Sequence, residues 1–534
     1  MVNMDIDKNG FKLFKITCKL FAILLTYEFL FSANVLAFEW RIRPNLSMSE
    51  VFSDNLALSD NAKKSGFVSE VSPGISAYGS SPWSNFNLNY RMQGLYNAGG
   101  SDAFDINHQL QMNSLYQAVR NTLFLQTSSS ISQQNISNTF ITTDNLTGNS
   151  GRVEAKNFSI SPYWTPHFGQ YANGMLKVGY QKSTFDNANS NTTSASLLNQ
   201  ISDTESFSRQ ARLSSGSKFN TVRWNLNYSS QDQNRVDAND VRFEQYAGNL
   251  RYYFNRKYNV FVNAGYENND FQTASNNINN GFFYTFGAQW NPSMFYSLEA
   301  GYGNNKHVAV RVNPSANFSA FITYRNKDVG LNTGSSWDAN LRYRVKQAAV
   351  NFTYSQDTTT VQQVLADQQI FADLTGGAVS SNTGQQLLLL NPNLPNLTLG
   401  NDVIISKNAK LSFTFQTGKS FYNASLYNTR RNYEPSLVED NVYGASASWR
   451  WQFDPRLNFY LRPNWQSTDS GGASTVNSQR YDVAMGLTRG IPINLGRPLL
   501  MNTSIEFRHI KQQSDIATND YTENRATANF AVRF

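Results

Sequence analysis

The sequence predicts an all-β chain that folds into a transmembrane, antiparallel, up-and-down β-barrel of about 24 strands, within a range of roughly 18 to 24. Three observations predict this fold class. Aromatic residues make up 14% of the 534 residues, whereas charged residues make up only 16%. Apolar and polar residues alternate with a period of two in many segments of about ten residues. Short and long connections between these segments also alternate along the chain.

The first 37 residues differ from the rest and predict a cleavable secretory signal. Four lysines precede a 12-residue apolar run from Leu20 to Phe31, and the residues up to Ala37 fit a cleavage site. The run is too short for a comfortable membrane helix, and Glu28 interrupts it. We therefore expect cleavage of residues 1–37, with an uncleaved anchor as the alternative. Residues 38–534 then form one exported domain without any Cys.

The exported part contains no run of 18 consecutive apolar residues, so no helical membrane span is expected. Two classes of protein remain, a secreted all-β protein and an outer-membrane barrel. Both would show strands with alternating faces, such as the strand with Val222, Trp224, Leu226 and Tyr228 on one side. The strands alone therefore do not decide between the two classes.

The last strand keeps its alternation through the final residue. Phe530, Val532 and Phe534 lie on one face with small residues before them, and polar residues mostly occupy the other face. We interpret this segment as the strand that closes a barrel. Its aromatic end is typical of the signal that barrel-assembly machinery recognises in outer-membrane proteins. The alternative is an ordinary edge strand of a secreted protein.

The connections between strands favour the membrane barrel. Short connections are predicted at 255–258, 291–294, 346–347, 417–419 and 454–456. Longer polar connections are predicted at 231–240, 268–280, 326–335, 357–404, 430–440, 466–479 and 511–522. Counting back from Phe534 places the short ones on the side of the carboxyl terminus. This arrangement predicts short periplasmic turns and long extracellular loops in the outer membrane of a Gram-negative cell. Lipid and lipopolysaccharide would then surround the barrel.

Arginine dominates the charged residues of the predicted interior. Directing the apolar faces outward places several arginines inward, and the acids on the same faces are fewer. The candidates for a basic lumen are Arg91, Arg223, Arg251, Arg342, Arg344, Arg450, Arg462 and Arg508. A lumen lined in this way would attract anions, for example an anionic polysaccharide. The alternative is that these arginines pair with acids and stiffen the barrel.

The loop at 357–404 is unusually apolar for an extracellular connection. Thr360 and Gln363 fit a capping box at the start of a short helix. Apolar residues follow near helical spacing, namely Val361, Val364, Leu365, Phe371 and Leu374. Such a surface should not face water. We expect the loop to fold into the mouth of the lumen as a constriction, to lie against the rim, or to pack on a partner protein.

Motifs for catalysis are missing from the sequence. None of the four histidines belongs to an HExxH motif, and no phosphate-binding or nucleophile-elbow motif stands in a suitable context. Some outer-membrane barrels are hydrolases, and His509 is the best candidate for such a role here. A histidine at the membrane boundary explains it more simply. We expect no enzyme, no metal site, no cofactor and no nucleic-acid partner.

The start of the exported part carries a family resemblance. It reads FEWRIRPNLSMSEVFSDNLAL, followed by GFVSEVSPGISAYG. These two strands and the step between them resemble the outer-membrane proteins associated with the PEP-CTERM and exosortase sorting system of exopolysaccharide-producing Gram-negative bacteria. The resemblance implies a barrel that accompanies exopolysaccharide export or surface-protein sorting, and it identifies no functional residues. Two alternatives remain, a general diffusion porin and a structural or docking barrel without an open pore.

The terminal strand leads to a first prediction. Deleting Phe534 should block membrane assembly, because the residue contributes to the predicted recognition signal. The variant should accumulate as protease-sensitive periplasmic protein without the heat-modifiable mobility of a folded barrel. Phe534→Tyr keeps an aromatic end and is the control. Wild-type levels of heat-modifiable barrel from the deletion variant would contradict the assignment.

Overall fold

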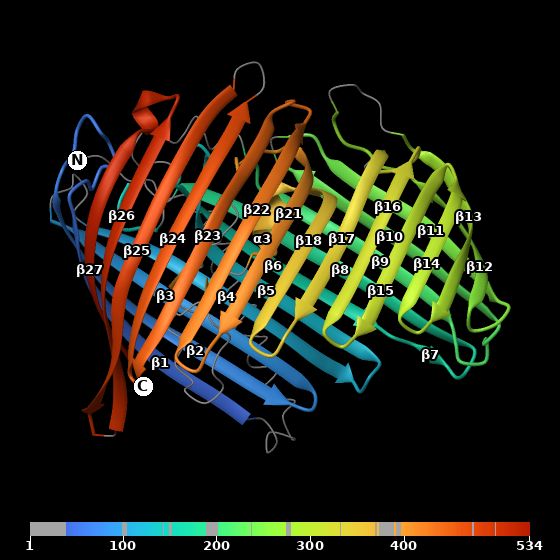
Figure 1. Ribbon diagram of the computed structural model, residues 1–534, viewed down its shortest axis with the longest axis horizontal. Helices are drawn as coiled ribbons and strands as arrows, with labels where there is room; N and C mark the ends of the chain where they lie inside the picture. Colours follow the sequence, from blue (N-terminus) through green and yellow to red (C-terminus); the bar gives the residue numbers. More distant parts are fainter. Residues whose placement is uncertain are drawn as a thin grey trace, which may run out of the picture.

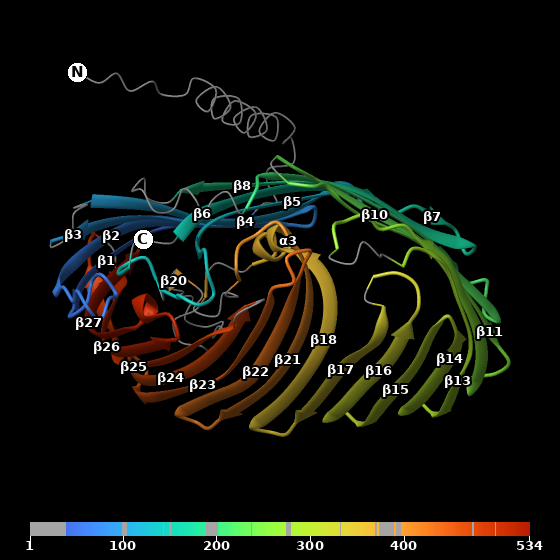
Figure 2. The ribbon, with the colours of Figure 1, turned by 90° about the horizontal axis from the view of Figure 1, so that it is seen from above.

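The computed structural model describes residues 39–98, 104–142, 144–148, 152–187, 201–236, 238–273, 279–331, 333–368, 371–372, 389–390, 397–471, 475–496 and 498–534. The predicted signal at 1–37 lies outside these residues. The described chain forms a closed barrel of 24 long antiparallel strands, joined in sequence order around the ring (Figure 1). The predicted fold class is therefore confirmed. Seen from above, the ring is elongated rather than circular (Figure 2).

The first half of the ring consists of β1 (Glu39–Ser53), β2 (Gly66–Ser81), β3 (Ser84–Asn97), β4 (Phe104–Val119), β5 (Leu123–Asn135), β6 (Arg152–Trp164), β8 (Ala172–Asn187), β9 (Thr204–Ser215), β10 (Val222–Arg235), β11 (Val241–Tyr253), β12 (Tyr258–Glu267) and β13 (Gly281–Ser293). The second half consists of β14 (Tyr296–Gly303), β15 (Asn305–Ser315), β16 (Phe318–Lys327), β17 (Gly334–Arg344), β18 (Ala348–Thr360), β21 (Val403–Gln416), β22 (Ser420–Glu434), β23 (Glu439–Asp454), β24 (Leu457–Gly471), β25 (Thr475–Asn494), β26 (Pro498–Ser514) and β27 (Tyr521–Arg533). The two-residue strands β7 (His167–Phe168), β19 (Phe371–Ala372) and β20 (Leu389–Leu390) are minor additions.

The barrel closes where the last strand pairs with the first. Strand β27 runs antiparallel to β1, with Val532 opposite Leu46 and Phe530 opposite Met48. The backbone N–H of Phe534 donates to the carbonyl of Pro44 at 2.8 Å. Phe530 and Val532 lie on the outer face of β27. Closure matters because no water is available inside a membrane to satisfy the backbone groups of an open edge.

The outer face of the ring is apolar and the inner face is polar. On β13 the outward residues include Phe282, Tyr284, Phe286 and Trp290, each at least 40% exposed. Cross-strand register keeps every strand on the same two faces, because directly opposed residues point to the same side. Inward positions elsewhere hold buried Ser, Asn and Gln side chains. This distribution is that of a transmembrane barrel, with lipid outside and polar groups inside.

Short turns and longer loops lie at opposite ends of the ring. Tight turns join β11 to β12, β13 to β14, β17 to β18 and β23 to β24, at the end where β27 finishes. Exposed aromatic residues flank these turns, namely Phe254, Tyr258, Trp290, Phe295, Tyr296 and Phe453. Aromatic side chains of this kind favour the boundary between lipid and water. We call this end the short-turn end and the opposite end the loop end.

Several strands extend further toward the loop end than the sequence predicted. Most of the expected loop 466–479 is strand, because β24 reaches Gly471 and β25 begins at Thr475. The expected loop 430–440 shrinks in the same way, since β22 reaches Glu434. Polar residues continue the hydrogen-bonded ladder beyond the apolar outer belt. Alternation of apolar with polar residues stops there, so the prediction ended the strands too early. Among the residues that the structure describes, no helix is long and apolar enough to cross a membrane.

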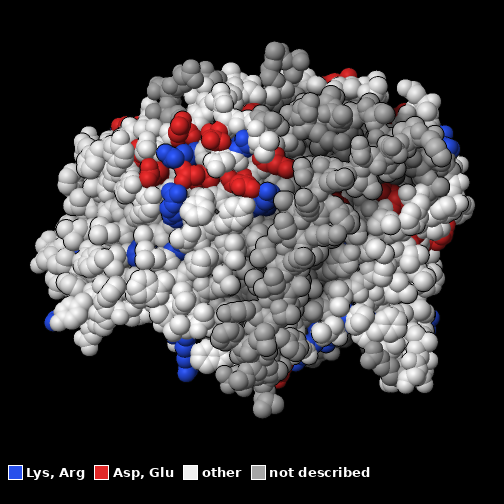
Figure 3. All heavy atoms as spheres, turned by 180° about the vertical axis from the view of Figure 1, so that it is seen from behind, with Lys and Arg blue, Asp and Glu red and all other residues white. Residues whose placement is uncertain are grey.

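Charged side chains decorate the outer face of β6 to β11 toward the loop end. Figure 3 shows acidic and basic residues gathered there on a largely uncharged face. Their ion pairs are Lys156 with Asp186 at 2.5 Å, Lys182 with Glu205 at 2.8 Å, Arg209 with Asp232 at 3.2 Å and Arg242 with Asp232 at 2.5 Å. Charges of this density do not belong in hydrocarbon. They therefore mark the upper limit of the lipid-facing belt.

Adjacent residues on β17 provide a test of the two faces. Leu341 points outward and Asn340 points inward. Leu341→Arg should destabilise the barrel by up to about 2–4 kcal/mol, because it places a charge in lipid. Asn340→Arg should have little effect, since its side chain meets the polar interior. Urea unfolding in lipid vesicles measures both, and equal losses of stability would refute the assignment of faces.

Candidate pore and its internal constriction

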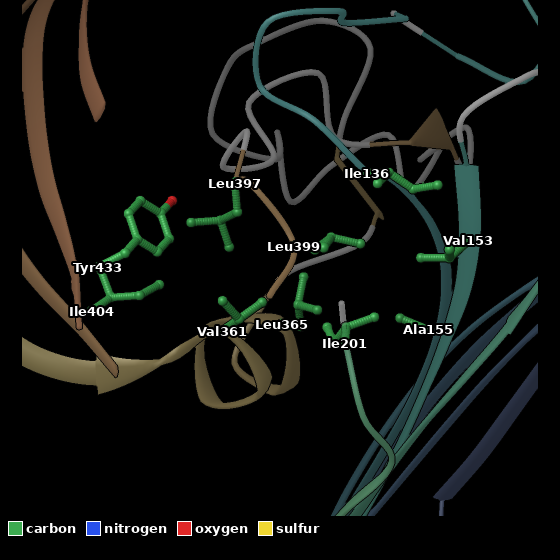
Figure 4. Packing of buried hydrophobic residues seen from close by; sticks show 10 residues of the cluster. All are labelled: Ile136, Val153, Ala155, Ile201, Val361, Leu365, Leu397, Leu399, Ile404 and Tyr433. Atoms are coloured by element: carbon green, nitrogen blue, oxygen red, sulfur yellow. The ribbon is translucent and has the colours of Figure 1, made fainter. Parts of the chain in front are cut away.

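A hydrophobic cluster inside the barrel joins two opposite walls. Buried residues form it, drawn from strands, loops and the helix α3 (Val361–Ala366) (Figure 4). They are Ile136, Val153, Ala155, Ile201, Val361, Leu365, Leu397, Leu399, Ile404 and Tyr433. We call this set the bridge cluster. Val153 and Ala155 belong to β6, whereas Ile404 and Tyr433 belong to β21 and β22. The cluster thus packs one wall against the other through side chains of the connecting loops.

The helix α3 contributes the centre of the bridge cluster. Thr360 and Gln363 form the predicted capping box, with the Gln363 side chain accepting from the Thr360 N–H at 3.0 Å. Val361 and Leu365 are almost fully buried, and Val364 packs against the cluster from its edge. These three predicted constriction residues therefore lie together inside the barrel. The backbone of Phe371 pairs with Leu390, and Leu374 lies outside the described residues.

Polar contacts hold the returning part of the same loop. Asn401 donates to the hydroxyl of Ser202 at 2.8 Å and accepts from Gln362 at 3.3 Å. Its carbonyl accepts from the guanidinium of Arg235 on β10. Asn401 therefore connects α3 to the wall on the β9–β10 side. Because buried polar groups need partners, this set of hydrogen bonds fixes where the loop enters the interior.

The bridge cluster divides the interior into two parts. Eleven long strands separate β6 from β21 in either direction around the ring. Figure 2 shows α3 between the two long walls of the elongated barrel. One part is enclosed by β8 to β18, and we call it the β8–β18 half. The other is enclosed by β22 to β27 and β1 to β5, and we call it the β22–β5 half.

A second inward loop crosses the β22–β5 half. The carbonyl of Thr139, in the loop after β5, accepts from Gln512 at 3.0 Å and from Ser478 at 3.1 Å. The hydroxyl of Tyr521 donates to the carbonyl of Ile141 at 2.9 Å. Farther along, Asn145 donates to Gln93 at 2.9 Å. The loop therefore contacts β25, β26, β27 and β3 from inside, and its side chains occupy this half of the interior.

An ion pair anchors the same loop to β27. Arg525 donates to both carboxylate oxygens of Asp144, at 3.1 and 2.6 Å. Burial alone would raise the pKa of the Asp144 carboxyl, but Arg525, together with the charges of Arg508 and Arg152, holds that pKa well below its usual range. The contribution of this pair to stability is complete above the ordinary carboxyl pKa of about 4. It is lost only as the pH falls through the lowered value, so the anchor persists at neutral pH.

The predicted lumen arginines of the β22–β5 half are occupied by neighbours. Arg508 donates to Asp482 at 2.8 and 2.5 Å, and Arg462 pairs with Glu506 at 2.7 Å. Arg91 lies 3.8 Å from Glu70 and is buried. Arg450, on β23 of the same half, lies over the ring of Phe421. Paired and buried guanidinium groups favour rigidity rather than attraction of a passing anion.

The inward arginines of the β8–β18 half differ from these in their partners and in their exposure to water. Arg251 pairs with Glu299 at 2.9 Å, but no carboxylate partner is found within the described chain for five others. These are Arg212, Arg223, Arg311, Arg342 and Arg344. They occupy inward positions on β9, β10, β15 and β17 near the short-turn end. We call them the arginine vestibule. All five are exposed, so water reaches them, and their charges act on whatever enters this half.

A cavity of about 280 Å³ lies farther along the β8–β18 half, toward the loop end. Residues of β10 to β13, β15 and β16 line it, and they combine amides with a few charged groups. Its cationic lining includes Arg325 and Lys327, and its acid is Glu267. The arginine vestibule and this cavity therefore follow one another along the same half. The amide groups of this cavity were not predicted, since each one alone resembles an ordinary polar strand residue.

No family model and no curated protein matches the chain. Among solved structures, it is similar to the FrpB iron transporter of Neisseria meningitidis, at 11% identity and a TM-score of 0.42 over 92% of this chain and 82% of that one. The ferric enterobactin receptor PfeA of Pseudomonas aeruginosa, as a mutant, gives 10% and 0.44 over 92% and 80%. OpdK of Pseudomonas aeruginosa with vanillate gives 8% and 0.33 over 92% and 99%. At these values the likeness carries no argument about cargo.

The contacts of two histidines bear on the predicted lack of catalysis. Within the described ranges, no group of three or more His, Cys, Asp or Glu residues could hold a metal ion. His509, the candidate for a hydrolase, points outward and contacts Asn524 at 2.8 Å. His307 points inward and lies 3.1 Å from Glu299. The contacts of these two histidines are thus with an amide and a carboxylate, and neither contact pairs the ring with the hydroxyl of a nucleophile.

The bridge cluster leads to a prediction about permeability. Leu365→Ala should weaken the cluster by about 2–5 kcal/mol, the usual cost of truncating a buried leucine. The division of the interior should then fluctuate, and single-channel conductance in planar bilayers should become larger or noisier. Leu226→Ala removes an exposed outward leucine and is the matched control. Identical conductance and identical protease resistance of the loop in both variants would contradict a constricting role.

Proposed function

We propose that this outer-membrane-type barrel is a pore for an anionic envelope polymer, and that it acts in exopolysaccharide export. The arginine vestibule is the observation that carries this proposal. Five water-exposed guanidinium groups without a described carboxylate partner line the short-turn end of the β8–β18 half. If the short turns are periplasmic, an outgoing chain meets these groups first. Guanidinium keeps its charge at any physiological pH and binds carboxylate and phosphate well.

The division of the interior supports a narrow path rather than a wide one. A ring of 24 strands would otherwise enclose a broad aqueous lumen. The bridge cluster and the loop after β5 leave the β8–β18 half as the part that holds the described cavity and the arginine vestibule. An extended polymer needs only such a narrow, charged route. The same restriction would limit the leakage of other solutes through the outer membrane.

The resemblance to PEP-CTERM-associated barrels points in the same direction, toward exopolysaccharide export or surface-protein sorting. A general diffusion porin is the runner-up, and the wetted basic interior agrees with it as well. A general diffusion porin, however, should let neutral and anionic solutes of equal size permeate at similar rates. A structural or docking barrel would show no conductance at all.

Ion selectivity tests the proposal. The purified barrel should favour anions over cations in planar bilayers under a salt gradient. Arg223, Arg342 and Arg344 replaced together by Gln should reduce the anion preference several-fold, because each charge contributes about 1 kcal/mol at short range in water. Arg489→Gln removes an outward arginine on β25 and is the control for loss of charge.

Three outcomes would count against the proposal. Cation preference of the wild-type barrel would overturn the basic pore, and equal selectivity of the triple variant would remove the arginine vestibule from the argument. A barrel that is folded by heat modifiability but never conducts would favour the docking role. Liposome swelling with neutral and acidic sugars of equal size then separates a polymer pore from a general porin.

A further inference from the structure

The cavity of the β8–β18 half has the composition of a small binding site. Its volume of about 280 Å³ lies just below the range of roughly 300–1,000 Å³ that ligand sites span. Amide side chains from two neighbouring strands meet there, among them Asn249, Asn263 and Gln245. One aromatic ring, Phe283, forms part of the wall and is only 9% exposed. The space suits one small cyclic molecule rather than a folded partner.

Two phenylalanine rings approach the backbone closely in the wall behind the cavity. A side chain at Gly265 would meet the ring of Phe283 at 2.4 Å, and one at Gly287 would meet the ring of Phe261 at 2.2 Å. Glycine at both positions therefore lets these rings approach the backbone closely. The ring of Phe261 in turn lies 4.8 Å from the guanidinium of Arg251. Phe261 is 2% exposed, so this ring packs within the wall behind the cavity.

A lysine without a described partner faces this cavity. Within the part of the chain that the structure describes, the ammonium of Lys327 makes no hydrogen bond or ion pair, although the nearby Glu267 acts on it by charge. The neighbouring Arg325 already pairs with Asp338. An ammonium that is partly removed from water gains from an anion that it can contact. The lining thus offers one place for a negative group.

The carboxylate of Glu267, near Lys327, is hydrogen-bonded to other groups of the protein. The carboxylate of Glu267 accepts from Gln245 at 2.8 Å and from the backbone N–H of Leu331 at 3.0 Å. It therefore serves the loop after β16 and does not neutralise Lys327 by direct contact. Its charge offsets part of the attraction of Lys327 for an anion, so the lining favours no more than one negative group. One negative group is expected for each bound molecule.

The amides define what surrounds that negative group. Amide side chains donate and accept hydrogen bonds, and hydroxyl groups do the same. Asn263 accepts from Asn249 across β11 and β12, so the two amides are fixed relative to each other. A molecule with several hydroxyls can use their remaining donors and acceptors. A simple inorganic anion would leave most of them unused.

We propose that this cavity binds one acidic sugar unit, with its carboxylate at Lys327, its hydroxyls at the amides and its ring face toward Phe283. This assignment rests on the proposed pore function and names the chemical class of its cargo, a chain that contains hexuronate units. The arginine vestibule would attract such a chain, and the cavity would hold one unit as the chain passes. Short residence at one site is compatible with transport, because binding must also allow release.

Binding of monosaccharides to the purified full chain tests the inference. Galacturonate and galactose share the same ring, but only galacturonate carries a carboxylate. Comparing their affinities by calorimetry in detergent therefore measures the effect of the charge. Galacturonate should bind at least about ten-fold more tightly than galactose, as expected for a charge-assisted contact in a sheltered site. Lys327→Gln should remove most of this preference. Lys410→Gln removes another inward lysine, on β21 outside the cavity, and should leave the preference unchanged.

The outcomes separate this inference from the pore itself. Equal binding of both sugars, or equal effects of the two lysine variants, would overturn the sugar site. If conductance remains selective for anions in that case, the proposed pore survives. If galacturonate binds as expected but the barrel never conducts, the pore is wrong and the binding site stands. Asn263→Ala provides a second variant. It should weaken the binding of both sugars, because it removes a contact to their hydroxyl groups.

Discussion

The paired backbone of a closed ring is the constraint on which the rest of this structure depends. Lipid offers no partner for an unpaired N–H or C=O group, so the ladder must return to its start, and β27 completes it on β1. Closure at 24 strands then creates a second problem, because the enclosed space is too wide for wall side chains to fill. Loops that fold inward fill part of this space. They also divide the interior into its two halves.

The inward loops use two different kinds of contact. The bridge cluster relies on burial of apolar side chains from both walls, such as Val153 of β6 and Ile404 of β21, around Leu365 of α3. The loop after β5 adds Ile136 to this cluster and is otherwise held by hydrogen bonds and by the ion pair of Asp144 with Arg525. The first kind is non-directional and closes space, whereas the second fixes position. Together these contacts fill and stiffen the β22–β5 half of the interior. The exposed arginines lie in the β8–β18 half.

Much of the fold could be predicted from the sequence, because alternation of residues along a strand is local information. The alternating last strand and the capping box of Thr360 and Gln363 were both recognised in this way. The sequence did not predict where β24 ends and β25 begins, because polar residues extend these strands beyond the lipid-facing belt. The inward loop after β5 also escaped prediction. Its apolar residues Ile136 and Ile141 follow no period, and they meet partners that are hundreds of positions away.

The state of each arginine shows most clearly what a single sequence lacks. Arg508 and Arg342 occupy inward positions of the same kind, and composition alone gives both the same interpretation. The first meets Asp482 on the neighbouring strand and becomes part of a buried network. For the second, no carboxylate is found in the described part of the chain, and its side chain stays in water. The difference depends on which acids the register of neighbouring strands places within reach of each guanidinium. An anion-attracting surface is therefore a property of the assembled barrel. The number of arginines in the chain does not determine it, and neither does the overall charge of +7.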